Sequence, residues 1–280
     1  MLSFATNTLS FATPLIFAAL AGYLSERSGV INIALEGKML LAACLAAIVG
    51  AALGPVAGIA AGLAAAVGLS MLHAIATQTY RVDHVVSGMA VNAIAAGAAN
   101  FVLLQNRDTA LAKAVQLPPL GVFQVLALLS VVVIALWVAN TRAGLRLVAV
   151  GNDPFKARLA GLQPVHIRFA ALVGTGLLAG LGGIYLVANS AGNYTDNMTA
   201  GRGYIALAAL ILGGWRPVAS LVVCLVFAAF AALSVQFQGQ PFLGLAVPGE
   251  FWTALPYVVT LIALALAMGR TRAPGGLGRF

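Results

Sequence analysis

The sequence predicts an all-α polytopic membrane protein with about nine transmembrane helices arranged in two halves of inverted topology. Apolar side chains make up 61% of the 280 residues and charged side chains only 8%, whereas about 25% are charged in a typical soluble domain. Apolar runs of the length needed to cross about 30 Å of hydrocarbon recur along the whole chain, and a basic segment near the middle separates two groups of them. The same composition excludes a soluble or disordered chain.

The first half of the protein, about 8–105, contains four apolar runs. Charges, prolines and polar clusters interrupt the apolar pattern between them. The predicted spans are 8–24, 39–54, 56–77 and 85–105. Segment 28–38 combines glycines with charged residues, so we expect a break in the helix there. No basic stretch precedes the first run, which is therefore interpreted as a retained span and not as a cleaved signal peptide.

A fifth span, 121–139, is predicted to bridge the halves and to lead into a cytoplasmic loop at 140–165. The second half, 166–269, has predicted spans at 166–188, 203–214, 218–236 and 253–269, with a cytoplasmic tail at 270–280. The run 203–214 is too short to cross, and it takes the place that the broken segment takes in the first half. Paired short or broken segments in two halves are typical of a substrate pathway. Residues 1–280 are thus expected to form one transmembrane domain.

The distribution of basic residues predicts the orientation of the chain. Twelve of the 15 Lys and Arg residues fall in one set of alternate loops, and Arg107, Lys113 and Arg202 fall in the other. The positive-inside rule places the first set in the cytoplasm, which gives an outer N-terminus and a cytoplasmic C-terminus. The net charge of +8 does not indicate nucleic acid as a partner, because the basic residues are dispersed and form no stripe with aromatic ones.

Motifs of soluble enzymes and metal sites are absent from the sequence. It contains no phosphate-binding loop, no His pair at metal-ligand spacing and no nucleophile elbow. Cys44 and Cys224 are expected to be buried free thiols, and His73, His84 and His166 are interpreted as interfacial residues at span ends. All seven acidic residues fall in loops or at span ends, which argues against a transporter driven by an ion gradient.

Five polar residues are candidates for a substrate pathway. Amide side chains inside a span are costly unless partnered, and two of them lie two turns apart on one face of the fourth span. Together with the polar residues of the broken segment and an aromatic residue in the short run, the candidates are Asn32, Glu36, Asn92, Asn100 and Tyr204. Two alternatives stay open. The amides could serve only interhelical hydrogen bonds, or 26–38 could be an interfacial loop with Glu26 and Arg27 solvated and Glu36 and Lys38 extending to the membrane surface.

Three segments carry a family resemblance. They are Ser28-Gly29-Val30-Ile31-Asn32-Ile33-Ala34-Leu35-Glu36-Gly37, the cytoplasmic stretch 149–162 and the run 206–214 with its closing Leu-Gly-Gly. In this order they resemble the hallmark segments of permease subunits of bacterial ABC importers for nucleosides and simple sugars, within the branched-chain amino acid and ribose permease superfamily. The Asn-Ile-Ala-Leu-Glu-Gly form favours nucleosides as the cargo, with ribose-type sugars and branched-chain amino acids as alternatives.

The resemblance implies a transport subunit of the bacterial inner membrane that is not itself an enzyme. It implies no cofactor on this chain, since ATP and Mg²⁺ bind to a separate ABC ATPase subunit. The other implied partners are a second permease subunit, giving a heterodimer, an extracytoplasmic nucleoside-binding lipoprotein, the small-molecule substrate and membrane lipid.

The resemblance also implies that a short cytoplasmic helix at about 153–161 docks on the ATPase. The sequence is compatible with this role, because Phe155, Leu159 and Leu162 recur on one helical face. Lys156 departs from the family pattern, in which a small residue is common at that place. The candidate coupling residues are Gly151, Asn152, Asp153, Pro154, Phe155, Lys156, Arg158, Leu159 and Gly161. A solvated linker without a docking role is the alternative.

Overall fold

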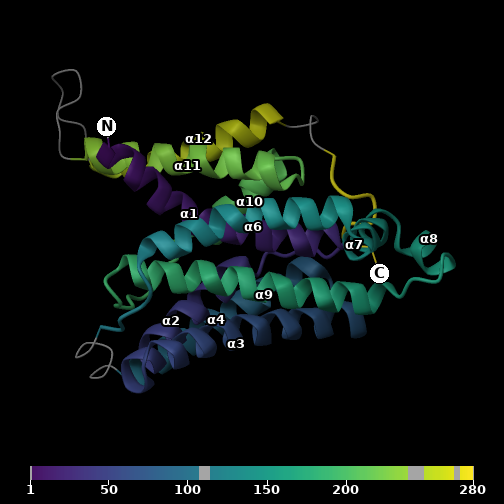
Figure 1. Cartoon of the computed structure of the whole chain (residues 1–280), viewed down its shortest axis with the longest axis horizontal. Helices are drawn as coiled ribbons and strands as arrows, with labels where there is room; N and C mark the ends of the chain where they lie inside the picture. Colours follow the sequence, from purple (N-terminus) through teal and green to yellow (C-terminus); the bar gives the residue numbers. More distant parts are fainter. Residues whose placement is uncertain (1, 107–113, 239–248, 268–271, 280) are drawn as a thin grey trace.

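The computed structural model describes residues 2–106, 114–238, 249–267 and 272–279, and the regular elements in these ranges are all helical. They are α1 (Leu2–Arg27), α2 (Leu35–Leu53), α3 (Pro55–Ala74), the π-helix η1 (Ile75–Thr79), α4 (His84–Gln105), α6 (Leu120–Asn140), α7 (Arg142–Asn152), α8 (Pro154–Leu159), α9 (Pro164–Asn189), α10 (Arg202–Leu212), α11 (Pro217–Phe237) and α12 (Gly249–Ala267). Most long helices run along the long axis of the molecule, with the two ends of the chain at opposite ends of the bundle (Figure 1). Arg107, Lys113 and the last residues of the predicted span 253–269 lie outside the described ranges.

Seven helices in the described part of the chain are long and apolar enough to cross a membrane, where about nine were predicted. The two that fall short are α10, with 11 residues, and the apolar part of α12 at Glu250–Ala265. At about 1.5 Å per residue, α10 extends only about 17 Å, roughly half of a hydrocarbon core. An apolar run in a sequence does not by itself distinguish a full crossing from a half-helix.

The segment 140–165, which was predicted to be a cytoplasmic loop, is largely helical. It forms the two helices α7 and α8, which meet at Asp153. Thr141 caps α7, since its hydroxyl accepts a hydrogen bond from the Gly144 N–H at 3.1 Å. Figure 1 shows α8 projecting beyond the ends of the long helices.

Helix α1 lies at the centre of the bundle, where it packs against α9, α10 and α11. Its middle turns are almost fully buried, including Phe17 and Leu20. Small residues allow α9 to approach its neighbours closely: a Cβ on Gly176 would lie 2.7 Å from the Cα of Val67 in α3, and one on Gly183 would overlap the backbone of Met39 in α2. Close backbone approach of this kind is how helices associate in lipid, where the hydrophobic effect no longer acts between them.

Helices α4 and α6 present apolar side chains on the outside of the chain. Exposed residues include Met89 and Phe101 on α4 and Leu129 and Val132 on α6. Such a surface suits lipid or another membrane helix.

Candidate functional site

The helix break predicted at 28–38 is present, and it occupies residues 28–34 between α1 and α2. Gly29 lies in the left-handed region with φ of 97°, a conformation that L side chains rarely adopt. A Cβ there would also lie 2.9 Å from a nitrogen of the Arg168 guanidinium. The turn therefore depends on glycine, and it leaves the first N–H groups of α2 to be satisfied from elsewhere in the fold.

Asn92 of α4 supplies one of these partners. Its Oδ1 accepts a hydrogen bond from the Gly37 N–H at 2.8 Å. Its Nδ2 donates to the Ile33 carbonyl at 3.0 Å and to the Tyr204 hydroxyl at 2.9 Å. A single amide thus joins the break, the first turn of α2 and the first turn of α10. These contacts include the interhelical hydrogen bonds that the alternative interpretation of the amides supposed. We call this meeting point of Asn92, Gly37, Ile33 and Tyr204 the junction. Tyr204 is 48% exposed, so part of the junction lies at the surface of the chain.

Glu36 caps α10 from another part of the fold. Its two carboxylate oxygens accept hydrogen bonds from the backbone N–H groups of Gly201 at 2.7 Å and Gly203 at 2.6 Å. Gly201, in the N-cap position, has no side chain that could cap the helix, and a carboxylate is favoured at a helix N-terminus by the helix dipole. Glu36 is 9% exposed, which contradicts the interfacial-loop alternative, in which its side chain extends to the membrane surface.

Lys38, in the first turn of α2, and Asn32, in the broken segment, form a buried polar pair. The Lys38 ammonium donates to Asn32 Oδ1 at 2.9 Å, and both side chains are fully buried. Asn32 Nδ2 has no hydrogen-bond partner among the residues that the structure describes. Lys38 therefore does not extend to the surface as the interfacial-loop alternative supposed. Glu26 is not solvated either, because it is 3% exposed and accepts a hydrogen bond from the Trp215 indole N–H at 2.6 Å.

The fold gathers four of the five predicted pathway residues around the start of α2. Asn32, Glu36, Asn92 and Tyr204 meet there through the contacts above. Asn100 does not join them, since it is exposed further along α4. The junction is polar and built from neutral amide, hydroxyl and backbone groups together with two buried ionisable side chains, so it can hold the broken segment in one arrangement and present hydrogen-bonding groups beside α10.

Two histidines contact the broken segment at Ile31. Both were interpreted from the sequence as interfacial residues. His73 Nε2 lies 3.0 Å from the Ile31 carbonyl oxygen, and its Nδ1 lies 2.9 Å from Ser87 Oγ. His84 Nδ1 accepts a hydrogen bond from the Ile31 N–H at 3.2 Å. Both rings are nearly fully buried, and both residues lie at span ends as predicted, His73 in the last turn of α3 and His84 at the start of α4. The sequence offered one signal: both residues lie near span ends on the same side as the break.

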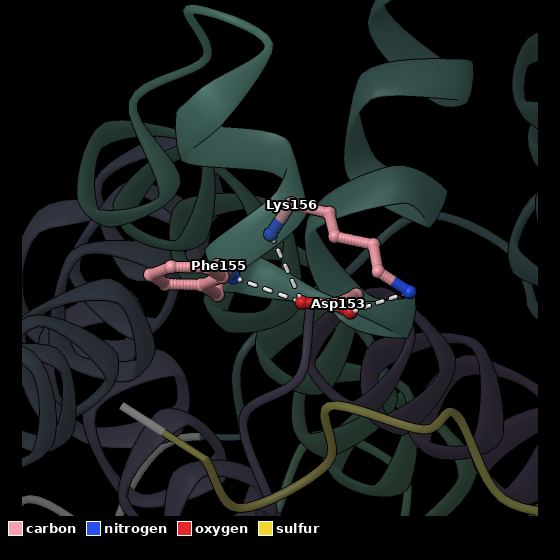
Figure 2. Close-up of polar contacts among 3 residues, drawn as sticks. All are labelled: Asp153, Phe155 and Lys156. Carbon is pink, nitrogen blue, oxygen red and sulfur yellow. Dashed lines mark hydrogen bonds and ion pairs between the residues drawn. The ribbon is translucent and has the colours of Figure 1, made fainter.

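A short helix, α8, is present where the coupling helix was predicted, and it is shorter than the expected 153–161. Asp153 caps it, because its Oδ1 accepts hydrogen bonds from the N–H groups of Phe155 at 3.1 Å and Lys156 at 3.0 Å, with Pro154 in the first turn (Figure 2). The Lys156 ammonium lies 3.3 Å from Asp153 Oδ2. The pKa of the Asp153 carboxyl is lowered, chiefly by the hydrogen bond from the Lys156 backbone. Gly161, with φ of 81°, follows the end of the helix.

The outer face of α8 combines large apolar groups with positive charge. Phe155 is 68% exposed and Leu159 is 74% exposed, and Lys156 and Arg158 are also exposed. The third residue of the predicted stripe, Leu162, is half-buried. Pro154 and Ala157 face inward. The exposed face of α8 therefore carries two large apolar side chains beside two basic ones.

Two other predicted coupling residues lie before α8. Asn152 is exposed, whereas Gly151 is buried against the carbonyl of Arg27, where a Cβ would overlap backbone atoms. Gly151 therefore has a packing role within this chain. Among the described residues, no group of three or more His, Cys, Asp or Glu residues could hold a metal ion, and Cys44 and Cys224 are buried free thiols as predicted.

Similar proteins agree with this architecture. Over 96% of its length the chain is 33% identical to the nucleoside ABC transporter permease protein NupC of Lactococcus lactis subsp. cremoris, and it covers 93% of that protein. It is 34% identical to the guanosine ABC transporter permease protein NupQ of Bacillus subtilis, with 97% of this chain and 93% of that protein covered. A putative glucose ABC transporter permease protein, TsgC13 of Haloferax volcanii, is 28% identical over 94% of this chain and 91% of its own length.

The match to a family extends over nearly the whole transmembrane region. Residues 4–264 match the family described as the permease component of the branched-chain amino acid transport system. This range includes the broken segment, the contacts around Asn92 and helix α8. The chain is therefore a multi-pass membrane protein that belongs to this family of ABC transporter permeases.

Proposed function

We propose that this chain is a permease subunit of an ATP-driven importer that carries nucleosides inward across the bacterial inner membrane. The observation that carries the proposal is the near full-length similarity to NupC and NupQ, whose names specify nucleoside and guanosine transport. The chemistry of the junction is in keeping with such a cargo. A nucleoside is neutral and rich in hydroxyl groups, so the Asn92 amide and the Tyr204 ring and hydroxyl suit it, whereas an unpaired buried charge would not.

The energy for import is proposed to come from a separate ABC ATPase subunit, which holds ATP and Mg²⁺ and binds the exposed face of α8. Phe155 and Leu159 are the proposed anchors on that face, and Asp153 holds the helix in place. An extracytoplasmic nucleoside-binding lipoprotein is proposed to deliver the cargo at the opposite end of the bundle. That end contains the C-terminal end of α9 and the N-terminus of α1 (Figure 1).

A second permease subunit is proposed to cover the junction from outside. Asn92 and Tyr204 meet at a partly exposed surface next to the exposed apolar residues of α4. Polar groups facing hydrocarbon are costly, so a partner helix or a shared aqueous path suits this place better than lipid does. We also propose an outer N-terminus, a cytoplasmic C-terminus and two inverted halves, in which α2 after its break and the short helix α10 take corresponding places.

The test begins with affinity purification of the tagged chain from native membranes in mild detergent, followed by mass spectrometry of the accompanying proteins. Recovery of an ABC ATPase and a second permease would support the proposal. Uptake of radiolabelled guanosine by cells with and without the chain then tests the cargo. A chain that purifies alone even after crosslinking, and whose uptake is abolished by a protonophore but unaffected by ATP depletion, would identify a gradient-driven transporter instead.

A simple sugar is the second candidate cargo, because TsgC13 is named a putative glucose permease. Competition separates the two candidates. An excess of unlabelled glucose or ribose should leave guanosine uptake unchanged if the cargo is a nucleoside, and an excess of unlabelled adenosine or uridine should reduce it. The reverse pattern, in which glucose or ribose reduces the uptake and adenosine or uridine does not, would favour a sugar as the cargo.

A further inference from the structure

We infer that segment 272–279, together with Arg168, forms a joint that transmits movement of the coupling helix α8 to the broken segment at the start of α2. The inference rests on the proposed function, because it assumes that a partner moves α8. It assigns a role to residues near the end of the chain and to a buried arginine at the start of α9. Neither was a candidate from the sequence.

Arg168 is the centre of the joint. It is 1% exposed, although it lies at the cytoplasmic start of α9. Its Nε donates to the Ser28 carbonyl at 3.1 Å, one terminal nitrogen donates to Gln78 Oε1 at 2.8 Å, and the other donates to the Arg279 carbonyl at 2.7 Å. The planar guanidinium thus fixes three segments at once: the broken segment, η1 and the last described residues. A single ammonium group could not reproduce this fork.

Segment 272–279 runs between the coupling helices and the broken segment. The Gly276 N–H donates to the Gly151 carbonyl at 2.9 Å, and the Gly278 N–H donates to the Gly29 carbonyl at 2.9 Å. Gly151 lies in the last turn of α7, three residues before Pro154, the first residue of α8. Backbone hydrogen bonds therefore join the coupling helices on one side of the segment to the broken segment on the other.

The contacts leave no room for independent movement. A Cβ on Gly276 would lie 2.7 Å from Pro154 Cδ and 2.9 Å from the Gly151 carbonyl oxygen. A Cβ on Gly29 would lie 3.1 Å from the Gly276 carbonyl oxygen. Groups packed this closely move together, since packed interiors transmit displacement and do not absorb it.

The joint leads directly to the candidate pathway. Gly29 and Ser28 begin the broken segment, which continues to Asn32 and to the Ile33 carbonyl that Asn92 binds. A displacement of α8 would reach the Asn92–Tyr204 junction through this short route, in addition to the direct packing of α7 against α1 and α9. Loss of the joint should therefore weaken coupling between ATP hydrolysis and transport while the bundle itself stays folded.

The main test compares the purified ATPase–permease complex containing the full chain with one lacking residues 272–280, reconstituted in liposomes. We expect similar recovery of the ATPase subunit and similar ATP hydrolysis, with about a tenfold fall in guanosine transported per ATP, which lies within the usual range of coupling between sites. Gly276→Val should disturb the same contacts without removing the segment, because its side chain would clash with Pro154. Arg272→Gln is the matched control, because Arg272 lies in the same segment but is exposed, and it should behave as wild type.

A second measurement does not depend on the cargo. Amide hydrogen exchange of the purified complex should speed up at residues 29–33 in the deletion and in Gly276→Val, without a change in the middle of α9. Unchanged exchange there, or an unchanged ratio of transport to hydrolysis, would overturn the inference. The inference would also be overturned if uptake fell only in proportion to the amount of assembled complex, because the segment would then have a purely structural role. If the wild-type complex itself does not transport guanosine, the proposed cargo fails, and the exchange measurement still decides on the joint.

Discussion

Replacing Glu36 with Gln should destabilise the junction between α2 and α10. The carboxylate accepts two short hydrogen bonds, from Gly201 and Gly203, on oxygens that are almost completely shielded from water. A glutamine amide keeps one acceptor oxygen, and it places an NH₂ donor against the second N–H. The variant therefore loses one charge-assisted hydrogen bond and leaves a buried donor without an acceptor.

The size of the effect follows from these contacts. A hydrogen bond to a charged group contributes about 1.5–3 kcal/mol net, and the favourable interaction of a carboxylate with the N-terminus of α10 adds about 0.3–1 kcal/mol. We therefore expect a loss of at least about 2 kcal/mol in the free energy of unfolding. For a chain of this size, such a loss lowers the midpoint of thermal unfolding by about 4–8 °C.

The assay is thermal unfolding of the purified chain in one detergent, followed by size-exclusion chromatography. Asp196→Asn is the matched control, because it makes the same carboxylate-to-amide change at an exposed residue near α10 and should not shift the midpoint. A Glu36→Gln midpoint within about 1 °C of wild type, where about 4 °C or more is expected for this loss, would refute the capping role. A shift of equal size in both variants would show a general charge effect.

Three further predictions concern the junction and the coupling helix. Asn92→Leu should reduce uptake per copy of the chain, because Gly37, Ile33 and Tyr204 lose their shared hydrogen-bond partner. The control Asn100→Leu, on the exposed surface of the same helix, should not reduce it. Equal uptake by the two variants, normalised to membrane abundance, would contradict this prediction. Phe155→Asp should lower the amount of ATPase that copurifies without lowering membrane abundance, because the side chain is exposed, and unchanged copurification would exclude α8 as the docking helix. The lowered pKa of Asp153 means that its cap is fully effective above the ordinary carboxyl range and is lost as the pH falls through the lower folded-state value. Protection of the Lys156 amide, measured against its intrinsic exchange rate at each pH, should therefore fall in that acidic range in the wild type and be low at every pH in Asp153→Ala; a wild type whose protection does not change with pH would contradict the cap.

The sequence by itself determined the features that depend on local chemistry. Composition predicted a helical membrane protein, glycine and charge predicted the break before α2, and the family resemblance implied a helix that starts near Asp153. The apolar stripe at Phe155 and Leu159 was visible in the same way, because three to four residues separate neighbours on a helix face. These signals lie within a few residues of the structure that they specify.

Only the tertiary structure decided which polar groups meet. Glu36 and the N-terminus of α10 are 165 residues apart, and Arg168 and the Arg279 carbonyl are 111 residues apart. A charged side chain near a span end has the same local sequence context whether it is solvated or buried, and its free energy depends on the partner that packing brings to it. That is why the sequence left open a surface position for Glu26 and Lys38, which lie inside, and gave no indication that His73 and His84 contact Ile31.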